Sequence, residues 1–280
     1  MSRKAPRPAP EAAALPPGGV DTHAHLDGDR YEDPLLVLER ARACGVSAVG
    51  NVFLGPAAYA ADHARFRVPG VFFLLGIHPY EADQATPDAL AAMEAAFRED
   101  SRLRAVGEIG LDYHYDFHPR AVQQDALCRQ LELALRLDVP VVIHSREAED
   151  DTLAILERMG LTHRPVLWHC FGLGADWAAE IVRRGWILSI PGPVTFPKNH
   201  ALRAAVAGLP PDSFVLETDC PYLAPEPYRG QRNEPALLVF TAREVARLRG
   251  EDPALVWRRC GATARRFFGI QEETGAEGGK

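Results

Sequence analysis

The amino-acid sequence predicts an α/β protein that folds as one (β/α)8 TIM barrel, and three observations support this. The 280 residues suffice for one large core, and a single barrel commonly has about this length. Eight short apolar runs recur along the chain, several of them unbroken as in strands of a parallel sheet. Helical patterns separate these runs, as connections between parallel strands require. A doubly wound open sheet is the main alternative, but no Gly-x-Gly-x-x-Gly follows a predicted strand.

The predicted strands and helices alternate along the chain. The eight strands are expected at residues 19–25, 46–53, 71–78, 103–109, 139–144, 165–169, 185–190 and 214–219. The clearest helices are expected to begin at Pro34, Pro119, Glu147, Ala175, Pro235 and Pro253. Proline suits the first helical position, and glycines after several of these segments are typical helix stops.

The barrel is expected to form a single domain over residues 19–270. Residues 1–18 are rich in Pro, Ala and Arg without a periodic apolar pattern, which predicts a disordered leader. Residues 271–280 are polar and Gly-rich, which predicts a flexible tail.

Composition excludes several functional classes. The chain is 47% hydrophobic and 25% charged with a net charge of −7, which disfavours a protein that wraps long duplex nucleic acid. An enzyme that binds one strand end or a small phosphorylated substrate remains compatible with this charge. No apolar run approaches the roughly 20 residues of a membrane span, and without an apolar h-region near the start no secretory signal is expected. Five widely spaced cysteines predict a reducing, cytoplasmic location.

Residues that can bind metal ions follow most of the predicted strands. In such a barrel, functional side chains project from the C-terminal ends of the strands. His23 and His25 lie two positions apart on an extended strand, so both side chains point to one face. Other strands end at His78, Glu108, His144, His169 and Asp219. A single buried histidine is commonly a core residue. Polar side chains at this many strand ends would be costly if they stayed unpaired, which favours a ligand that they share.

This pattern predicts a centre with two divalent metal ions. The expected ligands are His23, His25, Glu108, His144, His169 and Asp219. Glu108 is expected to bridge the two ions, with His23, His25 and Asp219 on one ion and the remaining histidines on the other. Imidazole ligands favour zinc or manganese over calcium, and magnesium is a third candidate. Such ions lower the pKa of bound water toward about 7, and Asp219 is placed to orient that water and take its proton.

At these residues the sequence closely resembles the TatD family of metal-dependent hydrolases (TatD-type DNases). The resemblance extends from about residue 19 to 269. The matching segments are Asp21-Thr22-His23-Ala24-His25-Leu26, Gly76-Ile77-His78-Pro79, Gly107-Glu108-Ile109-Gly110-Leu111-Asp112-Tyr113, Pro140-Val141-Val142-Ile143-His144-Ser145-Arg146, His169-Cys170-Phe171, Glu217-Thr218-Asp219-Cys220-Pro221-Tyr222-Leu223 and Tyr228-Arg229-Gly230-Gln231-Arg232-Asn233-Glu234-Pro235. The resemblance implies a TIM barrel, a two-metal site and hydrolysis of phosphodiester bonds, often as a DNase or exonuclease. It assigns metal binding to the six residues named above. Some relatives are assigned instead to aminoacyl ester removal from tRNA.

The resemblance also implies a substrate-facing loop at residues 229–234. Arg229 and Arg232 suit a phosphate, since guanidinium can bind it with two hydrogen bonds, and Arg146 can act in the same way. The alternative for each arginine is a salt bridge at the barrel rim. His78 is either a hydrogen-bond donor to a ligand or a substrate contact, with a purely structural role as the alternative. Glu217 is expected to support a neighbouring loop or ligand.

Two positions depart from the family pattern. Thr263 stands where an Asn is frequent, which removes one supporting hydrogen bond. Gln231 stands where a Lys is frequent, which removes one positive charge from the substrate loop.

Three functions are compatible with this pattern to different degrees. The first is a two-metal phosphodiesterase that releases nucleotides from a nucleic-acid strand end, with Glu108 and Asp219 as its catalytic carboxylates. The second is a metal-dependent esterase or amidohydrolase that acts on a small substrate or on aminoacyl-tRNA. Many such enzymes bridge their metals with a modified Lys where this chain has Glu108, which disfavours that function. The third is a metal-binding scaffold without turnover, which the intact ligand set disfavours. No obligate protein partner is indicated.

Overall fold

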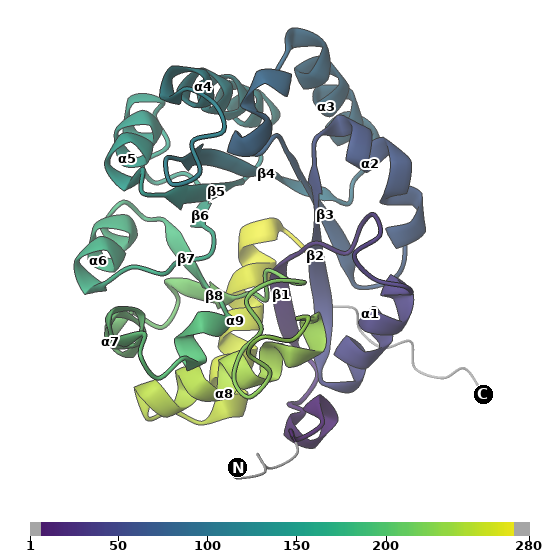
Figure 1. Ribbon diagram of the computed structural model, residues 1–280, viewed down its shortest axis with the longest axis vertical. Helices are drawn as coiled ribbons and strands as arrows, with labels where there is room; N and C mark the ends of the chain where they lie inside the picture. Colours follow the sequence, from purple (N-terminus) through teal and green to yellow (C-terminus); the bar gives the residue numbers. More distant parts are fainter. Residues whose placement is uncertain (1–6, 272–280) are drawn as a thin grey trace.

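The computed structural model describes residues 7–271, and it contains one sheet of eight parallel strands arranged around a central axis (Figure 1). The strands follow chain order, each paired with the next. They are β1 (Gly19–Ala24), β2 (Val46–Leu54), β3 (Val71–Gly76), β4 (Leu103–Asp112), β5 (Val141–Arg146), β6 (Val166–Trp168), β7 (Ile187–Ile190) and β8 (Phe214–Leu216). The predicted TIM barrel is therefore confirmed.

The ring of strands closes between β1 and the chain that follows β8. Ala24 forms an isolated parallel bridge with Cys220. The Asp219 backbone N–H donates to the carbonyl of His23 at 2.9 Å, and the His25 N–H donates to the carbonyl of Cys220 at 2.8 Å. These hydrogen bonds bring His23, His25 and Asp219 together, although they are almost two hundred positions apart in the chain.

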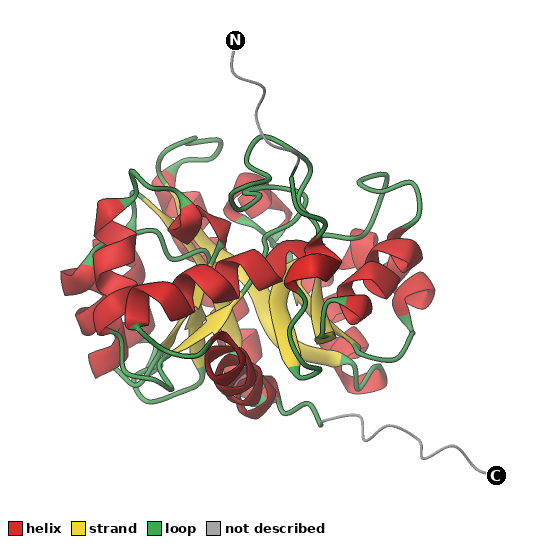
Figure 2. Cartoon of the chain, turned by 90° about the horizontal axis from the view of Figure 1, so that it is seen from below, coloured by secondary structure: helices red, strands yellow, loops and turns green. Residues whose placement is uncertain are grey.

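Helices surround the sheet on its outer side, and Figure 2 shows the strands at the centre with helices around them. The α-helices are α1 (Pro34–Ala43), α2 (Pro56–Asp62), α3 (Pro87–Glu99), α4 (Arg120–Leu137), α5 (Glu149–Arg158), α6 (Ala175–Arg183), α7 (His200–Gly208), α8 (Leu238–Arg249) and α9 (Pro253–Phe268). Short 3-10 helices are η1 (Pro10–Ala13), η2 (His63–Phe66), η3 (Pro79–Gln84), η4 (Gly192–Thr195) and η5 (Pro235–Leu237). Helices α2, α3 and α7 were not among those predicted. Within residues 7–271, no helix combines the length and apolar character needed to cross a bilayer.

The starts of several helices follow directly from the sequence. Asp33, Thr86 and Asp252 each precede a proline at the first helical position. Their side-chain oxygens accept hydrogen bonds from backbone N–H groups of the first turn at 2.9, 3.2 and 3.0 Å, respectively. Such caps satisfy donors that the helix itself leaves unpaired, so these boundaries are fixed locally.

The inside of the barrel is filled by apolar side chains, and α9 contributes to this filling. Val20, Phe72 and Val142 belong to a buried cluster that also contains Ala264 and Phe268 of α9. The rings of Phe72 and Phe268 have their centroids 4.8 Å apart. The barrel is thus a packed core rather than a pore, and one of its layers is completed by the last helix.

Residues 7–18 were predicted to be disordered, but they pack against the barrel. Leu15 is buried and its backbone N–H donates to the carbonyl of Cys44 at 3.2 Å. The indole N–H of Trp257 donates to the carbonyl of Pro16 at 2.8 Å. A side chain at Gly45 would place its Cβ 2.1 Å from the Leu15 carbonyl oxygen, so this contact requires glycine. Composition predicted disorder because it does not reveal such partners. The rest of the predicted leader, residues 1–6, and residues 272–280 of the predicted tail lie outside the described residues.

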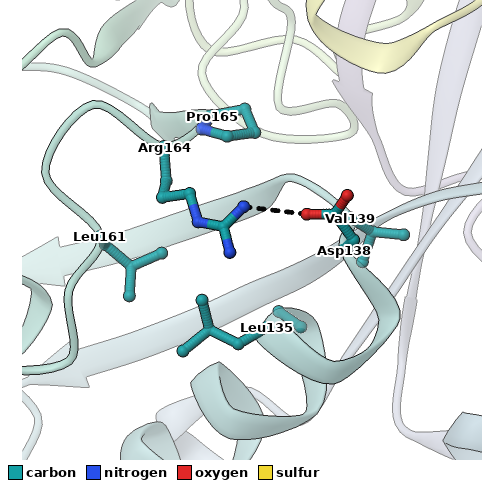
Figure 3. Close-up of a pocket in the computed structure, with 7 residues that line it drawn as sticks. Leu135, Asp138, Val139, Leu161, Arg164 and Pro165 are labelled. Carbon is teal, nitrogen blue, oxygen red and sulfur yellow. Dashed lines mark hydrogen bonds and ion pairs between the residues drawn. The ribbon is translucent and has the colours of Figure 1, made fainter.

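Figure 3 shows a pocket where α4 ends and where the chain enters β5 and β6. Its lining is largely apolar, and Arg164 Nη1 lies 2.9 Å from Asp138 Oδ1 beside it. This pocket lies at the N-terminal ends of the strands, whereas the candidate ligands follow the opposite ends. It is therefore separate from the predicted centre.

Candidate metal centre

The six predicted ligands lie together at the C-terminal ends of the strands. His23 belongs to β1, Glu108 to β4 and His144 to β5. The other three, His25, His169 and Asp219, lie in the chain just after β1, β6 and β8. Parallel strands end at one rim of the barrel, which explains why residues distant in sequence meet there.

Glu108 occupies the middle of this cluster. Its Oε2 lies 3.2 Å from Nε2 of His169 and 3.7 Å from both Nε2 of His23 and Nδ1 of His144. Its Oε1 lies 3.7 Å from Nε2 of His25. Both carboxylate oxygens therefore face imidazole nitrogens, which is the arrangement expected of a carboxylate that bridges two cations.

Asp219 is the second carboxylate of the cluster. Its Oδ1 lies 3.5 Å from Nε2 of His25 and 4.0 Å from Nε2 of His23. His23, His25 and Asp219 have one possible ligand atom each within 4.8 Å of one another, as do His23, Glu108 and His169. The three residues expected on one ion thus lie together, whereas His144 and His169, which are expected on the other ion, fall in different groups.

His78 also reaches the cluster, on the side of His144. Its Nε2 lies 3.9 Å from Oε1 of Glu108, and it forms a third possible ligand group with Glu108 and His144. Its Nδ1 accepts the backbone N–H of Tyr80 at 3.2 Å, which fixes the ring at the start of η3. His78 therefore combines a structural hydrogen bond with a nitrogen directed to the centre.

Two buried carboxylates orient the histidines from behind. Glu217 Oε2 meets Nδ1 of His169 at 2.9 Å, which leaves Nε2 of His169 directed to Glu108. Asp112 Oδ2 meets Nε2 of His144 at 2.9 Å, which leaves Nδ1 directed to Glu108. Carboxylates in this position fix the tautomer and orientation of metal-binding histidines. Glu217 was expected to support a loop or ligand, whereas the contact made by Asp112 was not predicted.

The register between β4 and β5 produces the pairing of Asp112 with His144. Gly110 is the Cα partner of His144, and a Cβ at Gly110 would lie 1.8 Å from the His144 carbonyl oxygen. Only glycine allows the two strands to approach this closely. The Gly in the Gly-Leu-Asp sequence is therefore the signal that could have revealed the position of Asp112.

The buried charges give the histidines different protonation tendencies. Burial lowers the pKa of His23 far below its usual value and that of His78 to about 3, so both rings are neutral at pH 7. Burial acts in the same direction on His169, but Glu217 and Glu108 on either side raise its pKa well above the usual value. Burial also opposes ionisation of Glu108, yet the surrounding histidines hold the pKa of its carboxyl well below the usual range.

Buried nitrogens without hydrogen bonds test whether this cluster suits metal ions. Nδ1 and Nε2 of His23 and Nδ1 of His25 are buried and have no hydrogen-bond partner among the described residues. Most buried polar atoms in proteins are paired, so Nε2 of His23, which lies 3.7 Å from Glu108 and 4.0 Å from Asp219 without a hydrogen bond, indicates a missing partner. Neutral imidazoles with carboxylates form a donor set typical of zinc or manganese. The residues present therefore fit the predicted cations.

The three candidate phosphate-binding arginines lie on aromatic rings. The guanidinium carbon of Arg146 lies 4.7 Å from the centre of the Tyr115 ring, that of Arg229 lies 4.2 Å from Phe196, and that of Arg232 lies 5.7 Å from Tyr31. All three arginines are exposed, and none forms a side-chain ion pair or hydrogen bond with another described residue. The rim salt bridges considered as their alternative role are therefore not formed in residues 7–271.

The loop that carries Arg229 and Arg232 is fixed at its base. The buried Asn233 amide donates to the carbonyls of Thr218 and Tyr222 at 2.8 and 2.7 Å. Glu234 pairs with Arg40 of α1. Of the two departures from the family pattern, Gln231 is exposed in this loop, and Thr263 lies in α9, where its hydroxyl accepts from Arg266 at 3.1 Å.

Comparison with known proteins connects this site to one family. Residues 20–269 match the family model described as TatD related DNase. The chain is 37% identical over 262 residues to an uncharacterized metal-dependent hydrolase TatD of Mycobacterium tuberculosis, covering 90% of this chain and 98% of that protein. It is 35% identical over 256 residues to the 3'-5' ssDNA/RNA exonuclease TatD of Cronobacter sakazakii, covering 88% and 94% of the two chains. The crystal structure of YJJV, a TatD homolog from Escherichia coli, superposes with a TM-score of 0.84 at 28% identity over 90% of this chain and 98% of that one.

Proposed function

Because the chain belongs to the TatD-related DNase family of metal-dependent hydrolases, we propose that it is a two-metal phosphodiesterase that releases nucleotides from a nucleic-acid strand end. One observation carries this proposal. Glu108 has imidazole nitrogens of four histidines within 3.7 Å of its two carboxylate oxygens. The exonuclease activity named for a relative of 35% identity supports the choice of nucleic acid as substrate.

His23, His25 and Asp219 would hold one ion, His144 and His169 the other, and Glu108 would contact both. When bound, a pair of divalent cations stabilises charge on the oxygens of an in-line phosphoryl displacement and makes a water more acidic. Zinc, manganese and magnesium are the candidate ions. The donor set supports the first two most strongly, because neutral imidazole suits them.

The protein's own groups supply proton transfer and substrate placement. The Asp219 side chain is 15% exposed, the largest exposure among the ligand carboxylates, so it can meet a water on the open side of the cluster. The Asp219 side chain can orient that water and accept its proton. Arg146, Arg229 and Arg232 lie at the same end of the barrel without an ion pair to another described residue, and their guanidinium groups can bind the phosphates of the strand.

The test uses end-labelled single-stranded and double-stranded oligonucleotides, with magnesium, manganese and zinc in separate reactions. We expect metal-dependent hydrolysis by the wild type and none by Glu108→Ala or Asp219→Asn. The control is Asp138→Asn, which changes an exposed carboxylate at the opposite end of the barrel and should leave hydrolysis unchanged. Full activity of either centre variant would refute the assignment.

A substrate panel separates the alternative functions. It contains short esters, lactones and aminoacyl-tRNA beside the oligonucleotides. Turnover of these substrates without cleavage of oligonucleotides would indicate the esterase or amidohydrolase function. Retained fold and metal binding without any turnover would indicate a scaffold.

We also place the protein in the cytoplasm. All five cysteines are free, and three of them are buried, which suits a reducing compartment. Cell fractionation tests this location, and recovery of the protein from the extracellular medium would contradict it.

A further inference from the structure

Two aromatic side chains next to the centre are among the most exposed large apolar side chains of residues 7–271. Tyr115 is 51% exposed and Phe117 is 61% exposed. Their rings are nearly parallel, with centroids 5.7 Å apart and an interplanar angle of 9°. Aromatic rings are normally buried because of their large apolar area, so an ordered exposed pair requires an explanation.

The loop that carries this pair is held at both ends. Asp112 Oδ1 accepts the backbone N–H groups of His114 and Tyr115 at 3.1 and 3.0 Å. The Gln123 side chain accepts from the Asp112 N–H at 2.8 Å and donates to the carbonyl of His118 at 2.9 Å. The rings are therefore presented by a fixed turn, which lowers the entropy lost when a ligand binds.

Tyr80 connects the pair to the metal centre. Its ring meets Tyr115 and Phe117 edge to face, with centroids 5.6 and 4.9 Å away. Its hydroxyl donates to Asp112 Oδ2 at 3.0 Å, the same oxygen that meets Nε2 of His144 at 2.9 Å. Through these contacts, two side chains, Tyr80 and Asp112, connect the exposed rings to the candidate metal ligand His144.

The electrostatic surroundings of the pair suit a phosphate. The Arg146 guanidinium lies over the Tyr115 ring and has no carboxylate partner among the described residues. Glu147, the residue after Arg146, pairs with His114, whose Nδ1 lies 2.6 Å from its Oε1. A cation without a carboxylate partner among the described residues therefore lies against one ring of this exposed pair, at the open end of the barrel.

We propose that Tyr115 and Phe117 form a stacking platform for a base of single-stranded nucleic acid, with Arg146 binding a phosphate of the same strand. The platform rests on the proposed function, since it would hold the strand that the metal centre cleaves. Aromatic surfaces combined with cationic groups bind single strands with little sequence preference, because every base has a flat face. In a duplex, neighbouring bases cover those faces, so the platform selects an unpaired strand.

The test compares ligands that differ only in their bases. Equilibrium binding to the metal-loaded protein is measured with two fluorescein-labelled, nuclease-resistant phosphorothioate strands of equal length. One strand carries bases throughout, and the other has abasic residues in the three positions nearest the cleaved end. We expect the wild type to bind the base-bearing strand about 5- to 150-fold more tightly for each base that stacks.

Protein variants then assign this preference to the platform. Tyr115→Leu combined with Phe117→Leu keeps apolar side chains without flat rings and should abolish the preference. Tyr115→Phe combined with Phe117→Tyr keeps both rings and should retain it. Leu255→Ala, at an exposed position in α9, is the distant control and should also retain it. Melting temperature and metal affinity of each variant show that fold and centre are intact.

Several outcomes would overturn the platform. These are equal binding of base-bearing and abasic strands by the wild type, an undiminished preference in the double leucine variant, or tighter binding of a blunt duplex than of the single strand. Failure of the proposed function would look different. The wild type would then fail to hydrolyse either strand when the strands are made with ordinary phosphodiester linkages. Its preference for binding the base-bearing strand would still be measurable.

Discussion

Replacing Glu217 by glutamine tests whether the buried carboxylates behind the histidines control metal binding. Glu217 is fully buried, and both of its oxygens accept hydrogen bonds. Oε1 accepts the Cys170 backbone N–H at 2.8 Å, and Oε2 faces Nδ1 of His169 at 2.9 Å. Glutamine has nearly the same shape but offers one acceptor and one donor. Both hydrogen bonds therefore cannot persist unchanged.

Two consequences of this mismatch weaken the centre. If the amide NH2 faces Nδ1, the His169 proton moves to Nε2, the nitrogen that lies 3.2 Å from Glu108, and this nitrogen can no longer bind a cation. If the amide instead keeps its oxygen toward His169, the buried Cys170 N–H loses its partner, at a cost of about 1–3 kcal/mol. Changes to such supporting carboxylates commonly lower metal affinity by about 10- to 100-fold, or about 1.4–2.8 kcal/mol. We expect a loss in this range for Glu217→Gln.

Metal affinity is measured by competition with a chelator of known affinity, and hydrolysis is followed as a function of free metal concentration. Glu217→Gln should shift both curves to higher metal concentration and regain much of its kcat at saturation. Asp138→Asn is the matched carboxylate-to-amide control, because its side chain is 82% exposed and pairs with Arg164 far from the centre. Affinity within twofold of the wild type would refute the reasoning.

Three further predictions concern stability. Removal of metal by a chelator should lower Tm, and adding metal back should restore it, because ions that bind only the folded chain stabilise it; Glu108→Ala should show no such shift. Burial opposes ionisation of Asp100, but the Arg102 N–H and the Tyr59 hydroxyl hold its pKa below the usual 3.8. The stability that this carboxylate contributes is therefore present above pH 4 and lost as the pH falls. The free energy of unfolding in urea should therefore fall less steeply below pH 4 for Asp100→Asn than for the wild type. Parallel curves of this free energy against pH would contradict this prediction. Trp257→Phe removes the hydrogen bond to Pro16 and should lower the free energy of unfolding by about 0.5–1.5 kcal/mol. Hydrolysis should stay unchanged. An altered KM would show that the N-terminal segment reaches the site.

The sequence was most informative at positions where a polar side chain ends an apolar, buried strand. Apolar runs that end in His23, Glu108, His144, His169 or Asp219 place costly polar groups at the ends of buried strands, so their convergence could be predicted. The parallel pairing of the strands then determines which of these residues become neighbours.

Other features depend on contacts that composition and periodicity do not encode. The position of Asp112 behind His144 follows from the close approach of two strands at Gly110. Helix α3 was missed because Met93 is its only fully buried residue, so its apolar pattern is weak. Residues 7–18 were expected to be disordered because composition does not reveal their partners, some of which, such as Trp257, are more than two hundred positions away.

The position of α9 has a consequence for how the chain acquires its structure during synthesis. Ala264 and Phe268 complete a layer inside the ring of strands, yet they are synthesised after every strand of that ring. Until then, apolar side chains such as Phe72 and Val142 face water rather than protein, which exposes the nascent chain to aggregation. A premature stop that removed only the final turns of α9 would therefore open the interior of the barrel, although every candidate metal ligand would still be present.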